Sequence, residues 1–112
     1  KKILRVWGTG KPLRELIFVD DIADACIFFM NKKTKNFLIN IGTGKDRSIK
    51  DYAEFIIKKI DLNVKIKFDK RKPDGVPRKV LDISLAKKYG WKAKTSLDKG
   101  FDITYKAYLK KN

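Results

Sequence analysis

The chain has 112 residues, of which 28 are Lys or Arg, 13 are Asp or Glu and none is His, so its formal net charge is +15. That length predicts one domain or less, and the 43% apolar content is enough for a single core without disulfide or metal staples. The one cysteine, Cys26, excludes a disulfide framework and a zinc site built from several thiolates. The absence of His excludes Ser-His-Asp and Cys-His nucleophile systems and imidazole metal sites. We therefore expect no metal site.

The positive charge is carried by 23 Lys and only 5 Arg. A basic chain is typical of nucleic-acid-binding proteins, but Arg is the residue that recognises phosphates and bases bidentately, whereas Lys can lie on any solvated face. Nucleic acid is therefore not the expected partner. A non-catalytic basic module that binds nucleic acid or another polyanion remains the alternative from a different functional class.

No apolar run approaches the roughly 18 residues that a membrane span requires, and the longest, 22–30, is interrupted by Asp24. Nothing at the start resembles a targeting segment, because Lys1 and Lys2 lead directly into a strand-like run. The chain also begins without Met. We expect a soluble cytoplasmic protein, no membrane partner, and a piece of a longer chain.

The first half alternates β-prone and helical patterns. Strands are predicted at 3–7 and 13–19, on either side of the Gly-Thr-Gly-Lys-Pro loop. A helix follows from 19–21 to about residue 31, with Asp20 or Asp21 as its cap. A short buried strand is predicted at 37–41 and ends at a Gly-Thr-Gly turn, after which Ser48 caps a second helix.

The second half begins with a run at 64–68 that alternates apolar and basic residues, which predicts a half-exposed strand with Lys65 on its wet face. Residues 69–79 contain two prolines and a glycine and predict a long loop, a feature that is more often functional than not. A short helix capped by Asp82 or Ser84 ends at Gly90, and a last helix begins at Ser96.

Several local patterns have a structural interpretation beside a functional one. The Gly-Thr-Gly at 42–44 begins like a dinucleotide fingerprint, but Arg47 stands where the third glycine should be, which favours a tight turn. The adjacent Asp20 and Asp21 are better explained as helix cap and dipole partners than as an acid and base pair. Arg14 is an isolated Arg among apolar residues, so it is either an anion ligand or part of an intramolecular salt bridge.

Four motifs together resemble a known family: VWGTGKPLRELIFVDDIADA at 6–25, NIGTG at 40–44, KPDGVPRKVLD at 72–82 and YGWKAKTSLDKGFDITY at 89–105. Their order and spacing are similar to the carboxy-terminal part of nucleotide-sugar epimerases and reductases of the extended short-chain dehydrogenase/reductase superfamily. The resemblance covers nearly the whole chain. It implies an α/β fold, as a small mixed α+β piece in isolation, in which 1–112 is the substrate-binding region and 20–44 packs on a missing NADP-binding Rossmann domain.

The resemblance further implies that the intact protein, as a homodimer, epimerises two carbons of GDP-4-dehydro-6-deoxy-D-mannose and reduces its ketone with NADPH. In the family the amino-terminal part carries the NADP(H)-binding turn and the catalytic Ser, Tyr-x-x-x-Lys, Cys and His. This sequence has no Tyr followed four residues later by Lys, and Cys26 lies in a helix that looks buried. We therefore expect no catalytic, cofactor-binding or metal residue here, and an isolated chain without activity.

By the same resemblance, the substrate contacts are Trp7, Arg14 and Lys65, with Asp74 and Lys79 as weaker matches. Arg14 can bind a diphosphate bidentately, and Lys65 and Lys79 can add point charges, although the position of Lys65 is often Arg in the family. Trp7 offers a flat apolar surface, and Asp74 can accept from a ribose hydroxyl or a guanine amine. The expected partner is a GDP-sugar. The alternative within the family is another nucleotide-sugar epimerase or dehydratase.

Overall fold

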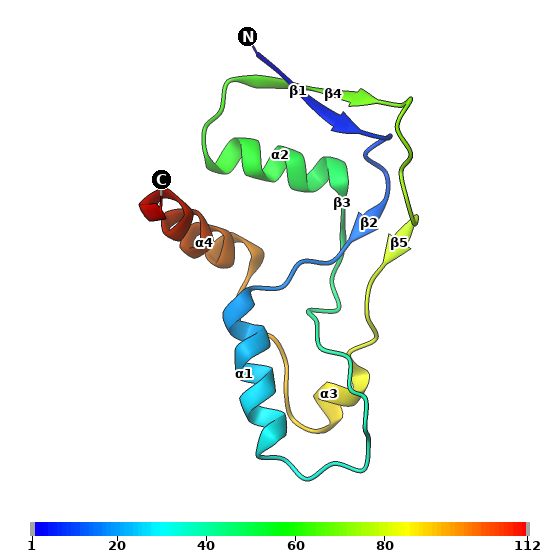
Figure 1. The fold of residues 1–112 in the computed structure, drawn as a ribbon, viewed down its shortest axis with the longest axis vertical. Coiled ribbons are helices and arrows are strands. Elements are labelled where there is room, and N and C mark those ends of the chain that lie inside the picture. Colours follow the sequence, from blue (N-terminus) through cyan, green and yellow to red (C-terminus); the bar gives the residue numbers. More distant parts are fainter. Residues whose placement is uncertain (1, 112) are drawn as a thin grey trace. The chain divides into compact units, whose positions relative to one another are not determined.

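The structure, a computed structural model, describes residues 2–111, which form a small mixed arrangement of short helices and strands (Figure 1). None of the helices in this described range is both long and apolar enough to span a bilayer. The elements in chain order are β1 (Lys2–Trp7), β2 (Leu13–Arg14), α1 (Val19–Met30), β3 (Arg47–Ser48), α2 (Ile49–Lys59), β4 (Val64–Asp69), β5 (Arg78–Lys79), α3 (Ser84–Lys88) and α4 (Leu97–Lys111).

The chain divides into two compact units. Unit 1 comprises the residues up to Arg14 together with Asp46–Val80, and unit 2 comprises Glu15–Lys45 together with the residues from Leu81 onward. The apolar side chains that are buried among the described residues are few: Ala25, Tyr52, Ala86 and Trp91. This differs from the single core that length and composition predict, because the apolar residues are divided between the units and many of them stay exposed.

In unit 1, β1 and β4 form a parallel pair, with Trp7 opposite Asp69 at one end (Figure 1). The predicted alternation of β4 is confirmed, because Lys65 and Lys67 are exposed while the apolar residues on either side of them are partly buried. Helix α2 begins where the sequence predicts, since the Ser48 Oγ accepts a hydrogen bond from the Asp51 N–H at 3.0 Å. These two observations confirm the predicted strand and cap.

A second sheet in unit 1 has the strand order β3-β2-β5, with only two residues in each strand. Its central strand is much shorter than the predicted strand at 13–19. The strands β3 and β5 offer partners only to Leu13 and Arg14, so the residues beyond them have no ladder to join. The prediction of a strand as far as residue 19 was therefore wrong.

In unit 2, α1 packs near α3 around a small core formed by Ala25, Ala86 and Trp91. The predicted cap of α1 was wrong, because Phe18 occupies the cap position and no side chain bonds to the free amides. Asp21 instead lies inside the first turn, buried, and its carboxylate accepts hydrogen bonds from the N–H and the Oγ1 of Thr95, at 3.0 and 3.1 Å. A buried carboxylate needs such donors, and these donors join α1 to the segment before α4.

The strand predicted at 37–41 does not form. Unit 2 contains no strand among its described residues, so this apolar run has no neighbour to pair with. Phe37 and Leu38 are exposed, whereas Ile39 and Ile41 pack against the core. The apolar pattern thus reports partial burial of this segment but not its backbone conformation.

Cys26 lies in α1 as predicted, but its side chain is exposed. The buried residues of this helix are Asp21 and Ala25, four residues apart on one face. Cys26 is one residue further, about 100° around the helix, and therefore leaves that face. The expected burial of this thiol was wrong.

The ends of the last two helices follow the sequence more closely. Gly90 ends α3 with a φ of 100°, a conformation that L side chains rarely adopt. The cap position of α3 is Ile83, but the Asp82 carboxylate accepts from the Ser84 N–H, which also lowers the pKa of Asp82. At α4 the Ser96 Oγ accepts from the Lys99 N–H at 3.2 Å, as predicted.

Candidate functional site

All five residues that the sequence analysis singles out lie in unit 1. They come from four strands and one loop: Trp7 from β1, Arg14 from β2, Lys65 from β4, Asp74 from the 70–77 loop and Lys79 from β5. None lies in unit 2, which contains the 20–44 segment. The candidate site can therefore be described within one unit.

Arg14 and Lys79 lie next to each other in the three-stranded sheet. Strands β2 and β5 run parallel with Arg14 in register with Lys79, and Arg47 of β3 lies opposite Arg14 on its other side. Residues in register on neighbouring strands project to the same face of a sheet. The three cations therefore form one basic row, defined as Arg14, Arg47 and Lys79.

The sequence predicted no site role for Arg47, which stands where a dinucleotide fingerprint would have its third glycine. The pairing that places Arg47 opposite Arg14 joins positions 33 residues apart, so the local pattern did not connect the two residues. The signal that singles out Arg14, an Arg in a chain of 23 Lys, applies equally to Arg47 and could have found it.

Arg14 is half-buried, and its Nη1 donates to the Leu13 carbonyl at 2.8 Å. It forms no ion pair within residues 2–111. The Glu15 carboxylate accepts from the Thr43 hydroxyl and from the Gly44 and Leu81 amides. An intramolecular salt bridge of Arg14 is thus not formed among the described residues, and the Gly-Thr-Gly segment at 42–44 is a bent segment in which the Gly44 amide already bonds to the Glu15 side chain.

Asp74 connects the 70–77 loop to the glycine-containing turn at 8–10 through hydrogen bonds to Thr9. Its two carboxylate oxygens accept from the Thr9 N–H at 2.6 Å and from the Thr9 Oγ1 at 2.8 Å. The backbone bond, then the hydroxyl bond and the charge of Lys11, lower the pKa of Asp74. Gly8 permits this contact, because a Cβ there would lie 2.1 Å from the Asp74 Oδ1. The contact that the structure gives Asp74 is thus with the protein's own backbone.

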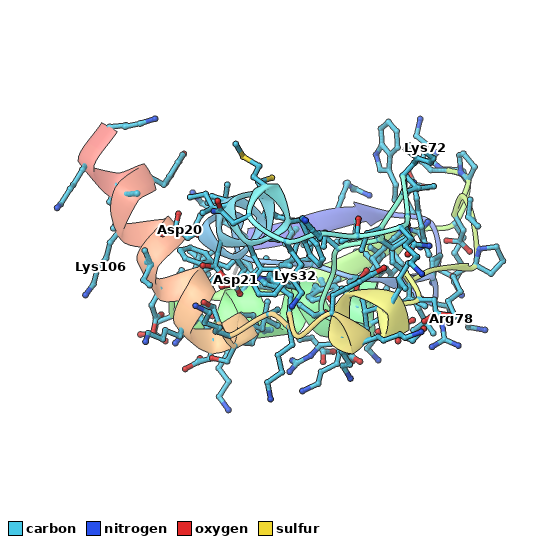
Figure 2. All side chains as sticks on the ribbon, turned by 90° about the horizontal axis from the view of Figure 1, so that it is seen from below. Asp20, Asp21, Lys32, Lys72, Arg78 and Lys106 are labelled. Atoms are coloured by element: carbon cyan, nitrogen blue, oxygen red, sulfur yellow. The ribbon has the colours of Figure 1, made fainter. Side chains whose placement is uncertain are left out.

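The same loop reaches Arg14 and Trp7. A Cβ added at Gly75 would lie 3.4 Å from the Arg14 Nη2, so the guanidinium lies close to this part of the loop. Trp7 is 67% exposed, and the Lys72 Nζ lies 5.0 Å from the centre of its ring, a cation–π contact. Lys72 and Arg78 project outward at this end of unit 1 (Figure 2). One part of the loop, at Lys72, therefore contacts the Trp7 indole, and another part, at Gly75, lies close to the Arg14 guanidinium.

Lys65 is farther away. It lies opposite Ile3, four residues before Trp7 along β1, a separation of about 13 Å at the rise of a strand. Lys65 and Trp7 share the exposed face of the β1–β4 pair, because both positions alternate in phase. The structure thus brings Arg14, Asp74 and Lys79 around the loop with Trp7 beside it, and leaves Lys65 at the other end of β4.

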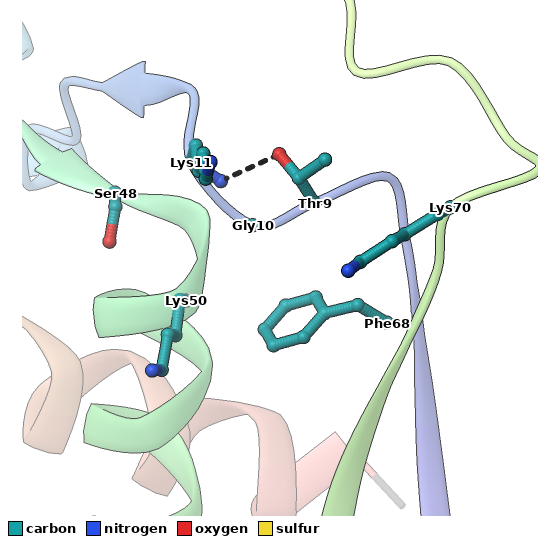
Figure 3. A pocket seen from close by; sticks show the side chains of 7 residues that line it. All are labelled: Thr9, Gly10, Lys11, Ser48, Lys50, Phe68 and Lys70. Carbon is teal, nitrogen blue, oxygen red and sulfur yellow. Dashed lines mark hydrogen bonds between the residues drawn. The ribbon is translucent and has the colours of Figure 1, made fainter.

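A separate pocket of about 550 Å³ lies in unit 1 (Figure 3). The Phe68 ring lines this pocket and packs closely on Gly10, where an added Cβ would lie 2.4 Å from the ring. Phe68 and Ser48 lie on the faces of the two sheets opposite to Trp7 and Arg14. Lysine is about every fifth residue of this chain, so the three lysines around the pocket do not identify an anion site. The lining residues are Thr9, Gly10, Lys11, Ser48, Lys50, Phe68 and Lys70.

Among residues 2–111, no group of three or more Cys, Asp or Glu side chains is placed to hold a metal ion. The candidate site residues around the 70–77 loop offer more hydrogen-bond donors than acceptors. Two guanidinium groups and one ammonium can bind an anion, and the exposed indole can stack on a flat group. This chemistry suits a ligand with both a phosphate and a ring.

Comparison with known proteins shows which proteins this chain is similar to. The model of the NAD dependent epimerase/dehydratase family matches residues 1–42. GDP-L-fucose synthase 1 of Arabidopsis thaliana is 44% identical over 105 residues, which are 94% of this chain and 32% of that protein. The chain resembles the carboxy-terminal third of a GDP-L-fucose synthase. This agrees with the resemblance to nucleotide-sugar epimerases and reductases that the four sequence motifs indicate.

Two solved structures from Campylobacter agree with that resemblance. A GDP-6-OMe-4-keto-L-xylo-heptose reductase from C. jejuni has a TM-score of 0.89 and 36% identity, and the match covers 99% of this chain and 35% of that one. A GDP-mannoheptose C4 reductase from the same species, solved with NADP bound, has a TM-score of 0.83 and 35% identity over 96% of this chain and 35% of that one. The chain therefore spans about a third of the length of these GDP-sugar proteins, in the extended short-chain dehydrogenase/reductase fold.

Proposed function

We propose that this chain is the substrate-binding part of a GDP-L-fucose synthase, and that unit 1 binds the GDP end of its substrate. The observation that carries the proposal is the basic row, in which Arg14 and Lys79 lie side by side against the 70–77 loop and form no ion pair within residues 2–111. A nucleotide sugar carries at least two negative charges on its diphosphate, so it supplies the missing counter-charge.

Each site residue has a role in this proposal. Arg14 binds the diphosphate through its fork of N–H groups, and Lys79 adds a point charge. Trp7 stacks on the sugar or the base, and Asp74 accepts from a ribose hydroxyl or a guanine amine while it keeps the loop on Thr9. Lys65, at the other end of β4, serves the part of the ligand farthest from the loop.

In the intact protein, NADPH reduces the ketone of GDP-4-dehydro-6-deoxy-D-mannose after two carbons are epimerised, and the cofactor binds outside this chain. The relatives that support this assignment are GDP-sugar proteins, one of them solved with NADP. A reaction of this kind needs a proton-transfer group and a hydride donor held against the sugar. On this proposal the 112 residues contribute substrate binding alone.

Unit 2 supplies the contact to the cofactor-binding part. Large apolar side chains of α1 and of the 37–38 segment are exposed, with Met30 at 82% and Leu38 at 81%. Large apolar side chains left exposed in this way are typical of an interface. We expect the residues 20–44 to pack on the NADP-binding domain of the intact enzyme, where the surrounding apolar side chains become covered.

The experiment that tests the proposed function is a titration of the 112-residue chain with GDP by isothermal calorimetry. Arg14→Ala should weaken GDP binding by about 1.5 to 3 kcal/mol, the range for a hydrogen bond to a charged group. Lys33→Ala is the matched control, because Lys33 is an exposed cation of unit 2 and lies outside the proposed site. Equal affinities for the two variants would contradict the assignment of Arg14 to the diphosphate.

A second candidate, a basic module for nucleic acid or another polyanion, is favoured by one observation, the net charge of +15. A chain that neutralises several phosphates only through its field loses affinity steeply as salt is raised. Salt dependence of GDP binding therefore separates the two candidates.

A further inference from the structure

Arg47 shares the basic row with the two predicted anion ligands but comes from a different segment. In the antiparallel pairing of β2 and β3 it lies directly opposite Arg14, at a Cα separation of about 5.5 Å or less. Lys79 lies on the other side of Arg14, one strand spacing or about 4.8 Å away. Like charges directly opposite each other destabilise a sheet, so an arrangement of three needs a counter-charge.

The protein does not supply that counter-charge within the described part of unit 1. Asp46 is bound to Arg78 at 2.7 Å, and Asp69 is bound to Arg71 at 2.9 Å. Both oxygens of the Asp74 carboxylate accept hydrogen bonds from Thr9. The structure gives Arg14, Arg47 and Lys79 no ion pair among residues 2–111. The acidic residues near the row are thus committed to other donors.

Arg47 is also held in place before any ligand arrives. Its guanidinium carbon lies 5.8 Å from the centre of the Phe55 ring on α2, a cation–π distance. Its neighbour Ser48 caps the same helix. The side chain remains exposed, so its N–H groups stay available to an anion. A fixed guanidinium loses less conformational freedom on binding than a free one, which favours a role in recognition.

From these contacts we infer that Arg47 is a third ligand of the diphosphate, beside Arg14 and Lys79. The inference rests on the proposed function and adds a residue to the same site. Two forks and one ammonium across three strands match a group with two phosphates better than a group with one. Arg47 therefore contributes to the selection of a nucleoside diphosphate over a nucleoside monophosphate.

The test is a calorimetric titration of the 112-residue chain with GDP and, separately, with GMP. Arg47→Gln should weaken GDP binding about tenfold and GMP binding by less than about threefold. Arg47→Lys, which keeps the charge and loses the fork, should give an intermediate loss for GDP. Lys33→Gln, which removes one charge from an exposed lysine of unit 2, should leave both affinities within about twofold. Far-UV circular dichroism and a urea midpoint confirm that each variant is folded.

The outcomes separate this inference from the proposed function. If Arg14→Gln weakens GDP binding and Arg47→Gln behaves like Lys33→Gln, the role of Arg47 is wrong while the site remains. An equal loss for GDP and GMP on Arg47→Gln also overturns the inference, because Arg47 would then not recognise the second phosphate. If the unsubstituted chain does not bind GDP, or if Arg14→Gln leaves GDP binding unchanged, the proposed function fails and the inference fails with it.

Discussion

Two carboxylates fix the loop that joins β4 to β5, and in each the donors around the side chain favour its ionised form. Asp74 accepts from Thr9, and Asp69 accepts from the N–H, Nε and Nη2 of Arg71 at 3.2, 2.9 and 3.1 Å. The Arg71 side chain lowers the pKa of Asp69 from 3.8 to about 2. The three cations of the basic row, by contrast, have no such partner among the described residues, which is why we assign the row and not the acidic residues to ligand charge.

The lowered pKa of Asp69 predicts how acid affects the loop. A carboxylate with a lower pKa in the folded than in the unfolded state stabilises the fold above its ordinary pKa, and that stabilisation is lost as the pH falls toward the folded value. Asp69→Asn should therefore lower the melting temperature at pH 6, and the difference from the unsubstituted chain should shrink between about pH 4 and pH 2. Thermal unfolding followed by circular dichroism across this range measures it. A difference as large at pH 2 as at pH 6 would contradict the role given to the ionised group.

At the scale of elements, the local signals predicted structure well where a few neighbouring residues determine it. The Ser48 cap and the end of α3 at Gly90 each depend on contacts within four residues, and the alternating run of β4 finds a pairing strand in β1. The run at 37–41 depended on a pairing strand elsewhere in the chain, and unit 2 supplies none among its described residues. Non-local pairing is invisible to periodicity, which is also why Arg47 was not grouped with Arg14.

The cap of α2 gives a stability prediction. Ser48→Ala removes the oxygen that accepts from the Asp51 N–H and should lower the free energy of unfolding by about 1 kcal/mol. Ser84→Ala is the control, because the Ser84 side chain bonds to the exposed Asp82 carboxylate and caps no amide of α3, so its change should be within about 0.5 kcal/mol. Urea unfolding of both variants measures the difference. A loss at Ser84 equal to that at Ser48 would show that the cap does not stabilise the helix.

At the scale of the whole molecule, every predicted substrate residue lies in unit 1, while the 20–44 segment lies in unit 2. The motifs predicted the fold class and the resemblance to GDP-L-fucose synthases correctly. The small number of buried apolar side chains could not be foreseen from composition, because 43% apolar content does not say which side chains remain exposed. We expect exposed side chains such as Phe37 and Met30 to become covered if the proposed NADP-binding domain packs on this segment.

The absence of a Tyr-x-x-x-Lys group in this chain gives a functional prediction for the molecule. The 112 residues mixed with NADPH and GDP-4-dehydro-6-deoxy-D-mannose should not consume NADPH, because the hydride donor and the proton-transfer group are not held in position. Absorbance of the reduced nicotinamide, followed over time, measures this. Oxidation of NADPH that depends on the chain and on the sugar would mean that catalytic residues lie within these 112.

The most direct test of the central claim compares GDP binding with the effect of charge alone. In about 0.5 M salt, where interactions between exposed charges are largely screened, GDP should still bind the chain and should displace inorganic pyrophosphate. Lys79→Gln should weaken GDP binding several-fold, whereas Lys33→Gln with Lys35→Gln, two exposed lysines of unit 2, should change it by less than about twofold. An equal loss in the two variants, or a loss of GDP binding as the salt is raised, would show that the positive field attracts the nucleotide and that unit 1 has no site for it.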